Sequence, residues 1–140
     1  MSVTSVTHLN FRGDARAALG FYHSVFGGDL AVVSYEEAGD TRNPAGPDQV
    51  VWGQVAAENG FRVMAYDVPS QLPWDRGVNS FFVSLRCGTT REVSDHWEKL
   101  SVGATVVQPL EPARWAPLHG MLEDRYGVVW VLDVASGENG

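Results

Sequence analysis

The chain has 140 residues, of which 44% are hydrophobic and 19% charged, and its formal net charge is −7. This composition is that of a compact globular protein, and it excludes a disordered chain. The negative charge argues against nucleic acid and anionic membranes as partners, because clustered Lys and Arg bind phosphate groups. The sequence has no run of about 18 apolar residues and no signal peptide at its amino terminus, so we expect a cytoplasmic protein.

The first half of the chain predicts one strand, one helix and three further strands. Asp14 is the predicted N-cap of the helix, apolar residues then follow a period of about 3.6 residues, and Gly27 with Gly28 ends it. Asn59-Gly60 is a strong hairpin signal between the last two strands. The expected strands span residues 6–11, 30–35, 50–56 and 61–67.

The second half predicts the same order of elements. A strand over residues 79–86 precedes a helix, and Thr89 followed three residues later by Glu92 is the capping-box pattern. Proline and glycine concentrate in three segments that we expect to be loops, at residues 39–47, 68–77 and 109–117. The remaining strands are expected over residues 105–107, 118–123 and 128–134.

The two halves also repeat one another in sequence. Trp52-Gly53-Gln54-Val55 matches His119-Gly120-Met121-Leu122, and each residue of the second copy follows its counterpart by 67 positions, as Gly127 follows Gly60. Two copies are too few for a solenoid, so the units should share one core and one cleft. We therefore predict an α+β fold in which two βαβββ modules, about 3–68 and 78–135, form a curved mixed sheet around a cleft within a single domain, 1–140.

Two segments of the chain resemble a known superfamily. The run from His8-Leu9-Asn10-Phe11 to Gly27-Gly28 resembles the opening signature of glyoxalase/bleomycin resistance/dioxygenase proteins, the vicinal oxygen chelate superfamily. The closing segment, residues 124–130, resembles that of its PhnB-like branch, labelled 3-demethylubiquinone-9 3-methyltransferase-like. The resemblance covers about the whole chain and implies the two-module fold and a homodimer. No glycine-rich nucleotide loop follows the first strand, which argues against methyl transfer.

The resemblance also implies where a metal would bind. Metal-binding members place one ligand on each of four strands, and the equivalent positions are Thr7, Gln54, a residue near Ser80, and Val131. A catalytic divalent metal needs about three protein ligands, and of these residues only Gln54 is suited. We therefore expect no metal and no cofactor. A displaced site formed by His8, His119 and Glu123 is the alternative, although packed or solvated side chains explain those residues as well.

The sequence contains no recognisable catalytic motif, and no catalytic residue is assigned. Cys87 is the single cysteine, which excludes an internal disulfide and a multi-thiolate metal site. Aromatic residues are the stronger signal: Phe82 and Trp130 are expected in the core, whereas Trp74 and Trp115 lie in proline-rich loops where an indole can cover a ligand. The predicted ligand-binding residues are Trp52, Gln54, Tyr66, Trp115 and His8.

Three functions remain open at this point. The first is a metal-independent protein that binds an aromatic or cationic metabolite or antibiotic and so could sequester it. The second is a metal-dependent lyase, isomerase or dioxygenase of the same superfamily. The third is a dimeric interaction domain without chemistry of its own.

Overall fold

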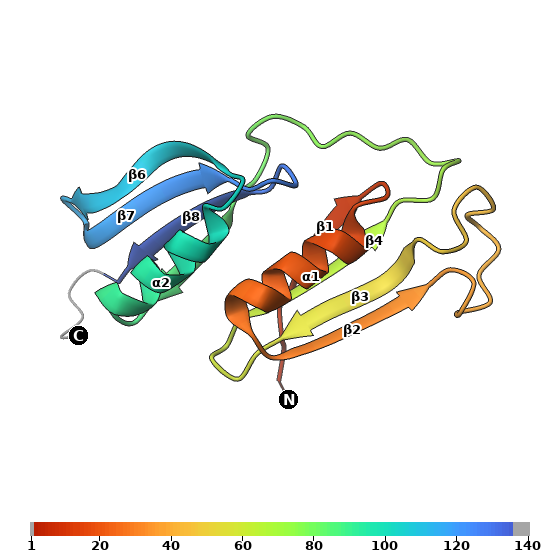
Figure 1. Cartoon of the computed structure of the whole chain (residues 1–140), viewed down its shortest axis with the longest axis horizontal. Helices are drawn as coiled ribbons and strands as arrows, with labels where there is room; N and C mark the ends of the chain where they lie inside the picture. The colour runs from red at the N-terminus through yellow and green to blue at the C-terminus, as the bar shows by residue number, and fades with distance from the viewer. Residues whose placement is uncertain (1, 136–140) are drawn as a thin grey trace. The chain divides into compact units, whose positions relative to one another are not determined.

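The computed structural model describes residues 2–135, and the chain divides into two compact units between Arg76 and Gly77. Each unit contains one helix and a four-stranded mixed sheet in the order βαβββ (Figure 1). The strand order is β1-β4-β3-β2 in the first unit and β5-β8-β7-β6 in the second. This is the predicted α+β architecture of two βαβββ modules. Unfolding as one cooperative domain stays a prediction.

In the first unit, α1 packs across one face of its sheet (Figure 1). Alternate strand residues such as Leu9 and Ala65 are buried beneath this helix, and a side chain at Gly53 would collide with Leu19 of α1. The opposite face therefore carries the residues in between, because strand side chains alternate. The elements are β1 (Thr7–Phe11), α1 (Ala15–Phe26), β2 (Asp29–Ser34), β3 (Val50–Ala56) and β4 (Arg62–Asp67).

The second unit is built in the same way. Its helix contacts β5, β7 and β8, and a side chain at Gly120 would meet the ring of Trp97 on that helix. The sheet thus has one helix-covered face and one open face, as in the first unit. The elements are β5 (Val83–Cys87), α2 (Thr90–Leu100), β6 (Thr105–Ala113), β7 (Ala116–Glu123) and β8 (Val129–Val134).

The strand register confirms the sequence repeat. Gly53 lies opposite Ala65 in the first unit, and Gly120 lies opposite Leu132 in the second, so both partners shift by the same 67 positions. The two hairpin turns also match, with φ angles of 101° at Gly60 and 88° at Gly127. Positive φ is a conformation that glycine adopts without steric strain, so the equal spacing of these glycines marks equivalent turns.

The two helices begin differently. The Thr89 side chain accepts a hydrogen bond from the Glu92 backbone N–H at 3.1 Å, as the capping-box pattern predicts. Asp14 occupies the N-cap position of α1, but its side chain makes no capping bond, so that part of the prediction was wrong. The buried carboxylate of Asp67 takes its place and accepts from the N–H groups of Gly13 at 2.7 Å and Ala15 at 3.1 Å.

Other sequence predictions also need correction. Residues 109–117 are not a loop, because β6 continues to Ala113 and β7 starts at Ala116. Pro109 and Pro112 fall at register irregularities along β6, and Pro117 lies near the start of β7. The strand expected from residue 79 starts only at Val83, which leaves the Phe82 side chain outside the strand and 42% exposed rather than in the core. Trp130 is fully buried, as predicted.

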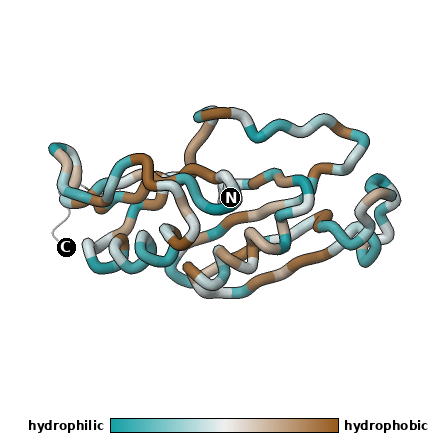
Figure 2. The backbone as a smooth tube through the Cα atoms, turned by 45° about the horizontal axis from the view of Figure 1, so that its top comes forward, coloured by the Kyte–Doolittle hydropathy of each residue, from teal (hydrophilic) through white to brown (hydrophobic). Residues whose placement is uncertain are grey.

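The hydropathy of the chain follows this architecture. Figure 2 shows hydrophobic stretches along the strands of the first unit, whereas the loop between β2 and β3 is mostly hydrophilic. Among residues 2–135, no helix is long and apolar enough to cross a membrane.

Candidate functional site

Four of the five predicted ligand residues lie on the open face of the first unit's sheet. His8 on β1 is paired with Met64 on β4, and Met64 is paired with Gln54 on β3, so these three residues form one row across three strands. Trp52 and Tyr66 lie two residues further along β3 and β4 on the same face. The alternation of β-strands therefore brings His8, Trp52, Gln54 and Tyr66 together.

The rings on this face are partly accessible. Trp52 is 37% exposed, and the ring centroids of His8 and Tyr66 lie 5.4 Å apart in an edge-to-face arrangement. Nδ1 of His8 is 3.0 Å from Oδ1 of Asn10, a hydrogen bond that orients the imidazole along β1. The surface combines aromatic rings with the amides of Gln54 and Asn10, which suits the flat ring and polar edge of a small organic molecule.

The segment that follows β4 is attached to the end of β1. Nε1 of Trp74 donates a hydrogen bond to the backbone oxygen of Asn10 at 3.1 Å. The Arg12 guanidinium donates to the backbone oxygens of Pro69, at 3.2 Å, and Leu72. Trp74, predicted to cover a ligand, is thus held beside the strand that carries His8.

Trp115 belongs to the second unit, where it forms the turn between β6 and β7. Its ring centroid lies 5.4 Å from that of His119, again edge to face. The predicted ligand residues therefore belong to two sheets. Four of them lie in the first unit, whereas Trp115 lies in the second unit beside His119.

The open face of the second unit carries charged residues that sequence reasoning missed. Arg86 is paired with Asp133, Asp133 with His119, and His119 with Glu111. These four residues form one row across the four strands. Nε and Nη2 of Arg86 donate to the two carboxylate oxygens of Asp133 at 3.2 and 3.3 Å. These hydrogen bonds raise the pKa of Arg86. The repeat offset could have revealed the row, because Asp133 follows Tyr66 by 67 positions.

The metal-ligand positions implied by the resemblance do not form a coordinating set. Thr7 is paired with Val63, which is buried beneath α1, so Thr7 and Gln54 lie on opposite faces of their sheet. Val131 follows Met64 by the repeat offset of 67 positions, and the two residues hold equivalent places in the strand register. Met64, rather than Gln54, is therefore the first-unit counterpart of Val131. His8, Met64 and Gln54 supply one imidazole, one thioether and one amide, a poor set for a divalent cation. Within residues 2–135, no three His, Cys, Asp or Glu side chains are grouped to hold a metal.

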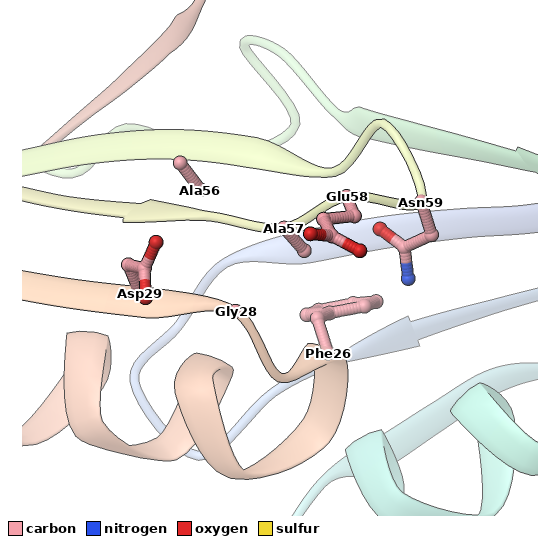
Figure 3. A pocket seen from close by; sticks show the side chains of 7 residues that line it. All are labelled: Phe26, Gly28, Asp29, Ala56, Ala57, Glu58 and Asn59. Carbon is pink, nitrogen blue, oxygen red and sulfur yellow. The ribbon is translucent and has the colours of Figure 1, made fainter.

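A hollow of about 360 Å³ lies elsewhere in the first unit, at the carboxyl end of α1. Figure 3 shows Glu58 and Asn59 reaching from the β3–β4 turn toward the ring of Phe26. The Phe26 ring is stacked on Phe61, with centroids 3.7 Å apart. None of the predicted ligand residues lines this hollow, so it is separate from the open face.

Two buried groups outside the predicted ligand residues have raised pKa values. Burial raises the pKa of the Cys87 thiol to about 11, and the neighbouring Glu92 and Asp133 carboxylates add to the shift. Cys87 is therefore protonated near neutral pH, which makes it a poor nucleophile. Burial also raises the pKa of Tyr35, whose hydroxyl donates to the backbone oxygen of Asp67 at 2.6 Å.

Comparison with known proteins assigns the family. Residues 3–132 match the family described as 3-demethylubiquinone-9 3-methyltransferase. The chain belongs to this family. This is the PhnB-like family that the opening and closing motifs predicted, and the chain shares its fold with glyoxalase/bleomycin resistance/dioxygenase proteins. No match was found among curated protein sequences.

Solved structures agree with this family. The chain is similar to protein PA1353 from Pseudomonas aeruginosa, with 31% identity, a TM-score of 0.83, and coverage of 96% of this chain and 98% of that one. It is 25% identical to the PhnB protein from Bacillus cereus, with a TM-score of 0.72 and coverage of 95% and 100%. A glyoxylase/bleomycin resistance protein/dioxygenase domain from Frankia sp. EAN1pec shares the fold at 14% identity, with a TM-score of 0.69 and coverage of 98% and 94%.

Proposed function

We propose that this PhnB-like protein binds a flat aromatic or cationic small molecule without a metal ion. The observation that carries the proposal is the grouping of His8, Trp52, Gln54 and Tyr66 on one partly accessible sheet face. Aromatic rings provide contact area for a planar ligand, and the Gln54 amide provides a hydrogen-bonding group that fixes its orientation. The net charge of −7 attracts a cation over longer distances.

The donor set supports metal independence. The row that contains His8 and Gln54 has Met64 between them, and its counterpart in the second unit contains Ser84, Val131 and Met121. Neither row offers the three nitrogen, carboxylate or thiolate ligands that catalytic metals need. Elemental analysis of untagged protein purified without chelators tests this point, and stoichiometric zinc, nickel, iron or manganese would favour the lyase or dioxygenase alternative.

We also propose that the protein is a homodimer in the cytoplasm. Among residues 2–135, the outer strands of each sheet have one edge without a strand partner, and pairing or covering such edges is a common solution in natural proteins. Light scattering at micromolar concentration tests the oligomeric state, and a monomer would refute this proposal without affecting ligand binding on a single unit.

The ligand proposal is tested by calorimetric titration with N-methylquinolinium, a flat aromatic cation, and with quinoline as its neutral analogue. Trp52→Ala is expected to weaken the cation by about 5-fold or more, because stacking and cation–π contacts are lost. Phe81→Ala is the matched control, since Phe81 is an exposed aromatic residue outside the sheet. Equal affinity of the wild type and Trp52→Ala, or an equal loss in the control, would refute the proposed face.

Gln54→Ala separates binding from folding. The Gln54 side chain is partly exposed, so water can replace its hydrogen bonds, and we expect the free energy of unfolding to change by less than about 1 kcal/mol. Affinity for N-methylquinolinium should fall, because the amide no longer orients the ligand. Urea unfolding and calorimetry measure the two effects on the same preparation.

A further inference from the structure

The second unit carries an arginine whose orientation is fixed by a buried partner. Asp133 is paired with Arg86 in the strand register, and its side chain is only 8% exposed, whereas that of Arg86 is 66% exposed. Nε and Nη2 of Arg86 are bonded to the Asp133 carboxylate, so the guanidinium plane is held in place. Its other edge, formed by Nη1 and the second hydrogen of Nη2, still has N–H groups that can donate.

An arginine held in this way is preorganised for an oxyanion. Two parallel N–H groups match the two oxygens of a carboxylate, and such forked contacts are among the stronger hydrogen bonds in proteins. Ser84 precedes Arg86 by two residues on the same strand and face, and its side chain is also exposed. The hydroxyl provides a further donor about 7 Å along the strand.

The two carboxylates in the same row as Arg86 leave room for an anion there. The Asp133 carboxylate is already neutralised by Arg86. Glu111 lies three strands away in the same row, at about 14 Å between Cα atoms at ordinary strand spacing. That separation exceeds the screening length of about 8 Å at physiological ionic strength. The two carboxylates of this row therefore do not block the free edge of the Arg86 guanidinium, and its hydrogen-bond geometry selects the anion.

Beside the guanidinium lies an apolar surface with an aromatic border. Val131 and Met121 are neighbours in the next row of the open face, and both are half-buried. His119 and Trp115 border that surface with their edge-to-face rings. A planar hydrocarbon ring can lie on Val131 and Met121 while a carboxylate attached to it reaches Arg86.

We propose that the open face of the second unit binds a small aromatic carboxylate, with the free edge of Arg86 holding the carboxylate and Val131, Met121 and His119 contacting the ring. The counterparts in the first unit are uncharged, because the 67-residue offset places Tyr66 where Asp133 lies and Trp52 where His119 lies. Recognition of the acid is therefore a property of the second unit alone, and it does not depend on the ligand proposed for the first.

The test is an NMR titration of the full-length, ¹⁵N-labelled chain with benzoate. Benzoate should cause saturable shifts in the backbone amides of β5 and β8 and in the indole N–H of Trp115. Benzamide has the same ring without the charge and should bind about 10-fold more weakly, because the charge-assisted contacts are lost. Equal binding of benzamide, or shifts confined to the first unit, would overturn the proposal.

Variants of the Arg86–Asp133 ion pair test whether Arg86 is responsible for benzoate binding. Arg86→Gln should weaken benzoate by about 10-fold, whereas Arg91→Gln, the same change on the exposed surface of α2, should leave it unchanged. Arg86→Gln also leaves the Asp133 carboxylate without its partner, so the double variant Arg86→Gln/Asp133→Asn provides a charge-free pair that should show the same loss. Wild-type affinity in a folded double variant, or an equal loss in Arg91→Gln, would refute the role of Arg86.

Trp52→Ala separates this site from the ligand face of the first unit. The substitution should leave the benzoate-induced shifts in β5 and β8 unchanged while it reduces N-methylquinolinium binding. Loss of the benzoate shifts in this variant would contradict two independent sites. Normal benzoate binding together with failure of the quinolinium titration would refute only the function proposed for the first unit.

Discussion

The two units have one backbone plan and two different open faces. Rows that correspond through the 67-residue offset contain Tyr66 and Trp52 in the first unit but Asp133 and His119 in the second. Their helix-facing residues are instead similar, with Gly53 and Gly120 beneath the helices and Val55 and Leu122 in the cores. The fold constrains the buried positions in both copies, whereas the open faces differ in the chemistry of their side chains.

The units also differ in where they place a buried aspartate. Asp67 at the end of β4 accepts hydrogen bonds from Gly13, Ala15 and Val50, and its counterpart in the second unit is Val134. Asp124 accepts from the backbone N–H groups of Tyr126 and Val128 and from Nε1 of Trp130. The first unit thus uses its carboxylate to start a helix, and the second uses one to close a hairpin.

The largest expected effect tests this difference. Asp67→Ala and Asp124→Ala should each lower the free energy of unfolding by about 3–4 kcal/mol, because each leaves three donors without their charged acceptor. Asp95→Ala on the exposed surface of α2 is the control and should change it by less than about 0.5 kcal/mol. Urea unfolding gives all three values. Hydrogen exchange should place the weakened amides at the start of α1 in one variant and in the β7–β8 turn in the other.

A smaller effect should distinguish the two buried glycines. In Gly120→Ala the new methyl group meets the Trp97 ring at 2.8 Å and the backbone Cα of Leu110 at 2.9 Å, neither of which can move easily. In Gly53→Ala it meets the tip of the Leu19 side chain, which can rotate. We expect losses of about 2–3 kcal/mol and about 1 kcal/mol, respectively. Equal unfolding free energies for the two variants would show that the helices pack equally tightly.

Cys87 offers a pH test within the second unit. Its pKa is raised from 9.0 to about 11 in the folded protein, so the folded state holds the thiol proton more tightly than the unfolded state does. This contribution is complete below pH 9 and is lost as the pH rises toward 11. The stability difference between wild type and Cys87→Ala should therefore fall by about 1–2 kcal/mol across that window. A difference independent of pH would contradict the shifted pKa.

The smallest effects are expected on the open faces. Trp52→His and His119→Trp exchange the counterparts between the units, and each should change the free energy of unfolding by less than about 1 kcal/mol, since these side chains are not fully buried. Binding should change instead, which titration with N-methylquinolinium and benzoate measures. A loss of several kcal/mol in either variant would show that the open face also supports the fold.

The sequence predicted the elements and the repeat because their signals are local. Alternation, the helical period and the glycines at the two hairpins are visible within short windows, and they identified both modules. The roles of Asp67 and Asp133 depend on partners in distant segments, such as Gly13 for Asp67 and Arg86 for Asp133, so no short window contains them. Residues 109–117 were misassigned because proline is usually a strand breaker, whereas the irregular edge strand β6 tolerates it.

The predicted ligand residues show the same limit. Period-two spacing was sufficient to place Trp52 and Gln54 on the same face of one strand. The pairing of Gln54 with Met64 and of Met64 with His8 can be known only from the order of the strands in the sheet. The residue pairs of the open faces become predictable once the offset of 67 is combined with that order.

The Asp67 carboxylate also has a consequence for the order in which the chain folds. It joins the start of α1 to a residue 52 positions away, so the first turn of that helix gains its acceptor only after the long segment between them has closed. In α2 the Thr89 hydroxyl and the Glu92 N–H are three residues apart and can meet at once. We therefore expect α2 to protect its first amides early during refolding, and α1 to do so only when β4 has docked.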